Sequence, residues 1–246
     1  MAESPDKLQV SNEEQRDETI TALAELVMKR DALKFGKFQV RANKTSPYQI
    51  DVGAMCYGKD TFAVGRAFAI TLGQNFGSDV DVCFGVPGKG AVMAALAAFY
   101  YGHLYNFEAQ WAFPQTLVPK PVEDVVVHGA SLSDRRIVII DDVLGDGAHL
   151  RDMVQLARDT GADVLGICVL IDRRERTKSN RLATTDIERD TGIPVLACCT
   201  VADLVKKMPE SYLPAEKREL VIKHATVEGG LIVPPLLPPF NKLTGL

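Results

Sequence analysis

The sequence has 246 residues, of which 46% are hydrophobic and 24% charged, and its formal net charge is −4. Such a composition is typical of an ordinary soluble protein, and the length fits one large domain or one domain with a small accessory part. The acidic balance argues against broad binding to nucleic acid or anionic membranes, and no hydrophobic run approaches the roughly 20 residues of a membrane span.

The N-terminal residues and the cysteines indicate the compartment. Residues 1–18 are polar and acidic, so we expect a flexible N-terminus without a recognisable targeting signal. The cysteines are odd in number, lack a C-x-x-C motif and lie mostly in hydrophobic runs. Reduced, buried thiols are the default for this pattern, so we expect a cytoplasmic or another reducing compartment. The cysteines are Cys56, Cys83, Cys168, Cys198 and Cys199.

The first third of the chain predicts helices on either side of a β-hairpin. Hydrophobic residues recur at helical spacing over residues 19–28 and again over 59–72. Between them, hydrophobic and polar residues alternate through residues 33–53, with a turn expected at Asn43-Lys44.

A short buried strand is predicted over residues 81–86, followed by a PGKG turn at 87–90 and a helix over 91–101. A glycine turn that carries Lys89 between strand and helix can bind an anion. The same pattern is also common structural punctuation. The connection over residues 105–128 is long and largely hydrophobic, which favours a functional segment.

The most informative stretch is the next one. The continuous hydrophobic run at 137–140 predicts a strand buried on both faces of a parallel sheet. Asp141 and Asp142 end this strand, a glycine turn follows at 145–147, and a helix is predicted over 148–159. The turn offers backbone N–H groups to an anion, and the acids suit two vicinal sugar hydroxyls or a hydrated Mg²⁺.

The remaining chain continues the alternation of strands and helices. This order predicts a doubly wound, mainly parallel sheet within a domain over residues 19–228. The segment 229–246 is hydrophobic and rich in proline, so we expect an extended C-terminal tail. The predicted strands lie at 164–171 and 194–199, and the predicted helices at 182–189, 201–207 and 215–224.

The run VIIDDVLGDGAH resembles the phosphoribosyl-diphosphate (PRPP) fingerprint of type I phosphoribosyltransferases. Three other stretches, in the same order as in the family, resemble orotate phosphoribosyltransferase. They are LKFGKFQVRANKTSPYQIDVG, FGVPGKGAVMAA, and GICVLIDRRER followed by IERDTGIPVLA. The resemblance implies the type I phosphoribosyltransferase fold, an α/β fold with a central, mainly parallel sheet flanked by helices and a small N-terminal hood hairpin.

The resemblance also implies an activity: transfer of the ribosyl phosphate of PRPP to orotate, with release of pyrophosphate and with Mg²⁺ carried by PRPP rather than by direct protein ligands. Asp141 and Asp142 would hold the ribose hydroxyls, and Lys89 would face the diphosphate. Arg41 and Arg173 would lie near orotate, where a guanidinium suits a carboxylate. The 5′-phosphate would lie in the turn formed by Gly145, Asp146, Gly147, Ala148 and His149.

The chain departs from the family pattern in several places. The family's flexible loop, R-K-E-x-K-D-H-G-E-G-G, closes over the diphosphate of the neighbouring subunit. Aligned after Tyr105-Asn106, this chain reads FEAQWAF over 107–113, without the basic residues. In the PRPP turn, Gly145 and Ala148 replace hydroxyl side chains and Asp146 adds a negative charge. The tyrosine usual before the lysine of the second corner is Gly88.

Several residues also have a plainer interpretation. The aspartate pair can be a strand-end turn with solvated carboxylates, and Arg41 and Lys89 can be solvated loop charges. Arg173 can instead belong to a surface ion pair with Asp172 or Glu175. His128 and His149 have no partner at metal-ligand spacing and can be incidental. Trp111, Phe107 and Phe113 favour a packed aromatic cluster.

Two function classes follow. In the first, the chain is an orotate phosphoribosyltransferase-like protein of pyrimidine metabolism that binds PRPP, orotate or a pyrimidine nucleotide, with weak turnover by the chain alone. In the second, it is a catalytically inactive relative, kept as a structural or regulatory subunit of a larger assembly. The hydrophobic segments at 105–124 and 231–246 predict that the chain is a dimer or part of such an assembly, because exposed apolar patches usually mark interaction surfaces.

Overall fold

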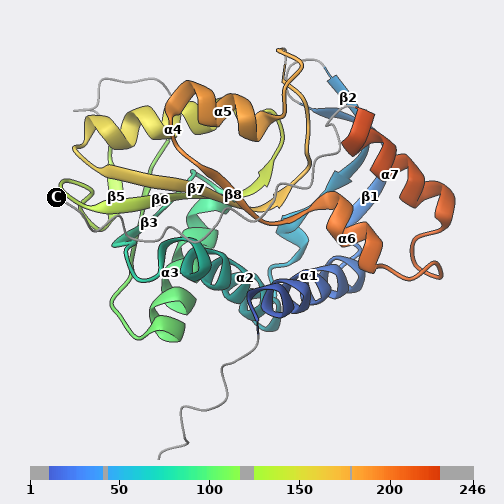
Figure 1. Ribbon diagram of the computed structural model, residues 1–246, viewed down its shortest axis with the longest axis horizontal. Coiled ribbons are helices and arrows are strands. Elements are labelled where there is room, and N and C mark those ends of the chain that lie inside the picture. The colour runs from blue at the N-terminus through green and yellow to red at the C-terminus, as the bar shows by residue number, and fades with distance from the viewer. Residues whose placement is uncertain (1–10, 41–43, 117–124, 178, 228–246) are drawn as a thin grey trace, which may run out of the picture.

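The computed structural model describes residues 11–40, 44–116, 125–177 and 179–227 (Figure 1). A six-stranded central sheet has helices on both faces, and a separate two-stranded hairpin lies beside it. This arrangement confirms the predicted α/β class. Arg41 and the tail at 229–246, for which we made predictions, lie outside the described residues.

The sheet has the strand order β5-β4-β3-β6-β7-β8. Every neighbouring pair is parallel except β4 with β5, which is antiparallel. The mainly parallel sheet that the alternation predicted is therefore present. The strands are β3 (Val82–Gly85), β4 (Gln110–Pro114), β5 (Val127–Gly129), β6 (Arg136–Leu144), β7 (Asp163–Asp172) and β8 (Val195–Thr200).

Strand β6 shows why the chain forms this sheet. Successive side chains of a strand point to opposite faces. Val138 and Ile140 accordingly belong to one hydrophobic cluster, and Ile137 and Ile139 belong to the other. All four are fully buried, as the continuous hydrophobic run predicted. The strand continues through Leu144. Asp141 and Asp142 therefore lie near the carboxyl end of the strand but still within it, rather than after its end.

The helices divide between the two faces. Helices α2 (Gly58–Phe76) and α3 (Lys89–Tyr105) cover one face, whereas α4 (Ala148–Asp159) and α5 (Ala183–Thr191) cover the other (Figure 1). The predicted bounds of α4 are confirmed. Gly161, with φ +82°, stands just after it in the left-handed conformation that glycine favours.

The N-terminal helix is longer than predicted. Helix α1 spans Asn12–Lys29, so residues 12–18 do not belong to a flexible N-terminus. The reason is a capping box: Glu14 N–H donates to Ser11 Oγ at 3.2 Å, and Ser11 N–H donates to the Glu14 carboxylate at 2.9 Å. Helices α6 (Val201–Lys207) and α7 (Ala215–Val227) complete the chain near their predicted positions.

The hood hairpin consists of β1 (Leu33–Val40) and β2 (Lys44–Ile50), paired antiparallel as predicted. Helix α7 packs against β2, where the Tyr48 and His224 rings meet edge to face at 5.5 Å. The hood therefore has its own support from the C-terminal helix.

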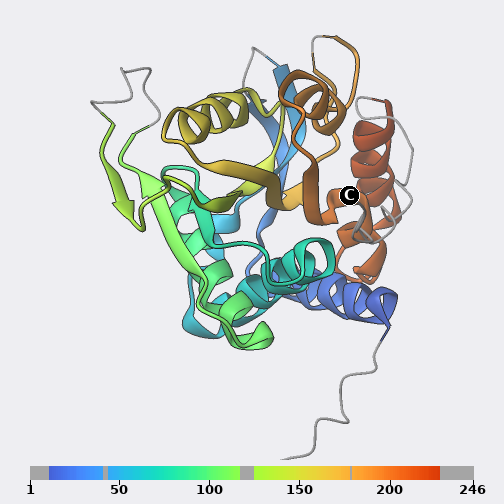
Figure 2. The same cartoon turned by 60° about the vertical axis from the view of Figure 1, so that its left-hand side comes forward.

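The placement of residues 107–113 corrects the sequence alignment. We aligned this segment with the family's flexible loop, but Gln110–Pro114 is β4, which pairs with β3 on one side and with the edge strand β5 on the other (Figure 2). Aromatic residues suit such a strand. The connection that follows β4 covers 115–126, of which 117–124 lie outside the described residues. Its sequence, QTLVPKPVEDVV, still contains a single basic residue.

The expected aromatic cluster is only partly correct. Trp111 and Phe113 stack with their ring centres 5.9 Å apart. Phe107 instead packs edge to face on Tyr101, at 4.6 Å. The cause is the strand, since β4 begins after Phe107 and carries the other two rings away from it.

All five cysteines are free thiols, and four of them are buried while Cys56 is exposed. Among the described residues, no helix is both long and hydrophobic enough to cross a membrane.

Candidate active site

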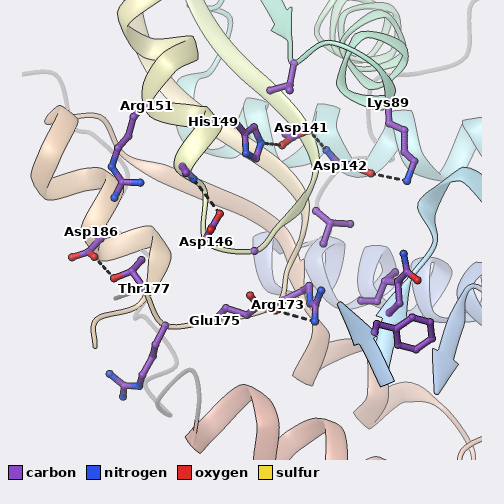
Figure 3. Close-up of a pocket in the computed structure, with 18 of the residues that line it drawn as sticks. Lys89, Asp141, Asp142, Asp146, His149, Arg151, Arg173, Glu175, Thr177 and Asp186 are labelled. Atoms are coloured by element: carbon purple, nitrogen blue, oxygen red, sulfur yellow. Dashed lines mark hydrogen bonds and ion pairs between the residues drawn. The ribbon is translucent and has the colours of Figure 1, made fainter. Parts of the chain in front are cut away.

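A cavity of about 890 Å³ lies between the hood hairpin and the carboxyl ends of the central strands (Figure 3). This edge of a parallel sheet is where open α/β proteins bind ligands. Most of the predicted site residues line it. They are Lys89, Asp141, Asp142, Gly145, Asp146, Ala148, His149 and Arg173. Gly147 belongs to the same turn without lining the cavity, and Arg41 lies outside the described residues.

The two carboxylates occupy different environments. Asp141 is buried, and its Oδ1 accepts the Asp142 N–H at 2.9 Å. Asp142 faces Lys89, whose Nζ lies 3.4 Å from Asp142 Oδ2 and 3.8 Å from Asp51 Oδ1. Burial and the neighbouring Asp141 charge raise the pKa of Asp142, against the opposing effect of Lys89. Lys89 therefore faces two carboxylates from the first position of α3, although its side chain stays half exposed.

His149 is also part of the site. Its Nε2 lies 2.6 Å from Asp141 Oδ2, in the first turn of α4. His149 therefore lines the cavity and contacts the acid pair, a position that favours the site assignment over the incidental interpretation. His128, by contrast, lies on β5 beside the Phe113 ring and does not line the cavity.

The turn at residues 145–147 needs a glycine at position 147. Gly147 has φ +64°, and a Cβ at this position would lie 2.4 Å from Ile187 Cδ1. Asp146 Oδ1 accepts the Ala148 N–H at 3.3 Å. One backbone donor that we assigned to an anion is thus used by the chain's own carboxylate.

Arg173 connects the central sheet to the hood. Its guanidinium donates to Ser46 Oγ at 2.7 Å and pairs with Glu175 at 2.9 Å. It also lies over the Tyr48 ring, 4.8 Å from the ring centre. The ion pair with Glu175 is therefore present, but both side chains are buried, so it is not the surface ion pair of the plainer interpretation. Asp172 has a different partner: it is fully buried and accepts the Arg174 N–H at 2.7 Å.

The cavity contains residues that the sequence analysis did not select. Phe38, Gln39, Gln49 and Ile50 enter from the hood. The far end is formed by the segment after β7 and by neighbouring helices, and it contributes Arg151, Glu175, Arg176, Thr177, Ser179 and Asp186. Glu175 and Arg176 belong to the DRRER motif and Thr177 and Ser179 follow it, which was the available signal for these four; Arg151 and Asp186 lie on α4 and α5, away from the motif. Which of them turn inward depends on the path of the loop.

Ion pairs and hydrogen bonds organise this far end. Asp186 accepts the Ser179 hydroxyl at 2.5 Å and the Thr177 hydroxyl, and these bonds hold the pKa of Asp186 below its usual value. Arg151 Nε donates to Asp190 at 2.9 Å. Figure 3 shows Arg151 and Asp186 on the opposite side of the cavity from Lys89. The described part of the chain shows no group of three or more potential metal ligands.

The sequence model of the phosphoribosyl transferase domain matches residues 59–191, more than half of the chain. The chain is 31% identical over 167 residues to an orotate phosphoribosyltransferase of Acinetobacter baumannii, covering 68% of this chain and 76% of that protein. It is 29% identical over 197 residues to the orotate phosphoribosyltransferase of Vibrio parahaemolyticus, covering 80% and 92%.

Solved structures are similar in the same way. The crystal structure of orotate phosphoribosyltransferase from Francisella tularensis matches with a TM-score of 0.64 and 25% identity, over 82% of this chain and 96% of that one. The UMP synthase of Leishmania donovani matches with a TM-score of 0.68 and 21% identity, over 83% of this chain and 42% of that one. The second match shows the fold alone.

Asp172 should make stability depend on pH. Burial raises its pKa to about 6 from an ordinary value of 3.8. The folded state therefore binds the proton more tightly than the unfolded state, and this group lowers the free energy of unfolding as pH rises from about 4 to 6. Asp172→Asn keeps an acceptor for the Arg174 N–H. Between pH 4 and 7 the free energy of unfolding of the wild type, measured by urea titration, should fall by roughly 2–3 kcal/mol relative to that of this variant. If the two free energies of unfolding change with pH in parallel, Asp172 does not have a raised pKa.

Asp146 should oppose anion binding at the turn. Asp146→Asn keeps the acceptor for the Ala148 N–H and removes the charge. We expect it to bind inorganic phosphate roughly three- to tenfold more tightly in calorimetric titration at low salt, with a smaller gain at high salt. The control is Asp159→Asn, which removes the same charge at the opposite end of α4. Equal affinities for the wild type and both variants would show that the Asp146 charge does not face the anion.

Proposed function

The chain belongs to the orotate phosphoribosyltransferase family, and we propose that it binds PRPP and orotate, or the nucleotide product, in the cavity beyond Asp141 and Asp142. The observation that carries this proposal is the convergence of four separate segments on one cavity: the hood, the Lys89 corner, the acid pair with its turn, and the segment after β7. An orotate phosphoribosyltransferase-like function in pyrimidine metabolism agrees with the relatives.

The ribose would lie over the acid pair. Carboxylate oxygens accept hydrogen bonds from hydroxyl groups, and two adjacent carboxylates match two vicinal hydroxyls. Asp142 and Lys89 are within 3.4 Å of each other, so one side of this position offers acceptors and the other a cation for the diphosphate. This arrangement supports a ligand that has both sugar hydroxyls and phosphates.

The base would lie under the hood. Phe38 and Ile50 provide apolar surface, and Gln39 and Gln49 provide amides that can donate and accept. Arg173 lines the same region, although Glu175 already balances its charge. Arg41 belongs to the hood sequence and keeps its proposed role near the orotate carboxylate.

Magnesium fits this site as a companion of PRPP rather than as a resident ion. The donor chemistry suits it, because hard carboxylate oxygens of Asp141 and Asp142 can hold the waters of a hydrated Mg²⁺. The ion would neutralise charge on the leaving pyrophosphate. The protein's own contribution is to align ribose and base and to supply Lys89 to the diphosphate.

We propose that turnover by the chain alone is weak. The connection between β4 and β5 has one basic residue in its sequence, Lys120, and two acidic ones. Each missing charge-assisted contact to a leaving phosphate costs roughly 2–4 kcal/mol of transition-state stabilisation. The Asp146 charge beside the phosphate turn adds to this deficit. The five free thiols agree with a reducing compartment.

The second candidate function is a non-catalytic subunit of an assembly, and a surface observation supports the assembly that it requires. Large aromatic side chains are exposed on α2 and α3: Phe62 by 56% and Phe99 by 64%. Both pack edge to face on Tyr100, at 5.2 and 5.0 Å. We call these three residues the aromatic face. An exposed aromatic cluster is characteristic of a protein interface.

Orotate-dependent pyrophosphate release should be at least about 10³-fold slower than that of the Vibrio parahaemolyticus relative, because the basic loop residues are missing. Residual release should be lost in Asp142→Asn and kept in Asp134→Asn, an exposed carboxylate outside the cavity. Calorimetric binding of Mg²⁺–PRPP without release would favour the second candidate. Turnover as fast as the relative's would contradict weak activity, and absence of PRPP binding would contradict the proposed site.

The aromatic face should bury against another chain. We expect light scattering after size exclusion to show a dimer or larger species for the wild type, and a monomer for Phe99→Asp. Leu220→Asp is the control, since Leu220 is 42% exposed but lies on α7. A wild type that is monodisperse and monomeric at tens of micromolar would contradict this interface.

A further inference from the structure

Each aspartate of the acid pair contacts a side chain from a different helix. Lys89, at the start of α3, faces Asp142 at 3.4 Å, and His149, in the first turn of α4, faces Asp141 at 2.6 Å. Figure 3 shows the two contacts on opposite sides of the pair. Each carboxylate therefore has its own partner, from a helix on its own face of the sheet.

The two contacts differ in their exposure to solvent and in the number of partners that hold each carboxylate. Lys89 is 52% exposed and shared with Asp51, so its contact with Asp142 can exchange for a ligand. The Asp141 side chain is only 7% exposed, and both of its oxygens are engaged: Oδ1 by the Asp142 N–H and Oδ2 by His149. Asp141 is thus held in one orientation, whereas Asp142 is adjustable.

The chemistry of the contact determines which group donates. A carboxylate accepts hydrogen bonds, so the hydrogen lies on His149 Nε2. Each oxygen of Asp141 still has a second lone pair for a hydroxyl, because a carboxylate has about four acceptor positions.

We infer that His149 is a positioning residue, which holds the Asp141 carboxylate in the orientation that accepts a ribose hydroxyl. This inference rests on the proposed function, since it assumes that the acid pair receives the ribose of PRPP. His149 acts through Asp141, and it affects ligands that contain the sugar rather than phosphates in general.

Two substitutions separate the hydrogen bond from the ring. His149→Gln keeps an N–H donor at about the reach of Nε2, and His149→Phe keeps the ring volume without a donor. The full chain is titrated calorimetrically with Mg²⁺–PRPP and with Mg²⁺–pyrophosphate, a probe that has no sugar. We expect His149→Phe to weaken PRPP binding about tenfold, the effect of one lost hydrogen bond to a charged group. His149→Gln should remain within about threefold of the wild type, and pyrophosphate binding should stay within about twofold in both variants.

A thermodynamic cycle with Asp141→Asn tests the route of the effect. If His149 acts through Asp141, His149→Phe should change PRPP affinity less than about twofold in the Asp141→Asn background. Equal PRPP affinity for His149→Phe and wild type would overturn the inference. So would an equal loss for PRPP and pyrophosphate, or a full tenfold effect in the Asp141→Asn background. If the unaltered chain binds pyrophosphate but not PRPP, the proposed function fails first, and this inference fails with it.

Discussion

Two neighbouring carboxylates at the end of a buried strand are the constraint on which the site depends. Asp141 and Asp142 adjoin a part of β6 that is covered by hydrophobic residues on both faces. Like charges so close to a core are costly unless each is paired or hydrogen-bonded. The neighbouring helices supply those partners, Lys89 from α3 and His149 from α4. The start of each helix is thereby tied to the same position on the sheet.

The hood follows a similar principle. Arg173 is buried between the end of β7 and the hairpin, where Ser46, Glu175 and the Tyr48 ring surround its guanidinium. A buried charge needs such partners, so their geometry defines where the hairpin lies relative to the sheet. Helix α7 supports the hairpin from the outside through Tyr48. The cavity is therefore the space between two substructures that Arg173 helps to hold together, through its hydrogen bond to Ser46 and its contact with the Tyr48 ring.

The phosphate turn combines family geometry with altered chemistry. Gly147 preserves the left-handed backbone that directs N–H groups towards an anion. Asp146 uses one of those donors, and the side chains of Gly145 and Ala148 add no hydroxyl. This turn retains the backbone shape needed to bind a sugar phosphate, but it offers fewer donors to that phosphate. The proposal of weak turnover has a separate physical basis, which is the single basic residue in the sequence of the β4–β5 connection.

What the sequence by itself determined was local. The hydrophobic run at 137–140 and the glycine turn after it were enough to predict β6, the bounds of α4 and the position of the acid pair, because these depend on short-range periodicity and backbone preference. The motif order was enough to predict the family. The segment 107–113 was misassigned as a loop, because its hydrophobic and aromatic residues become a strand only through pairing with β3 and β5. Tertiary structure alone decided that Glu175 balances Arg173 and that His149 meets Asp141, since such pairings depend on side-chain direction after a turn and on the path of the chain between elements.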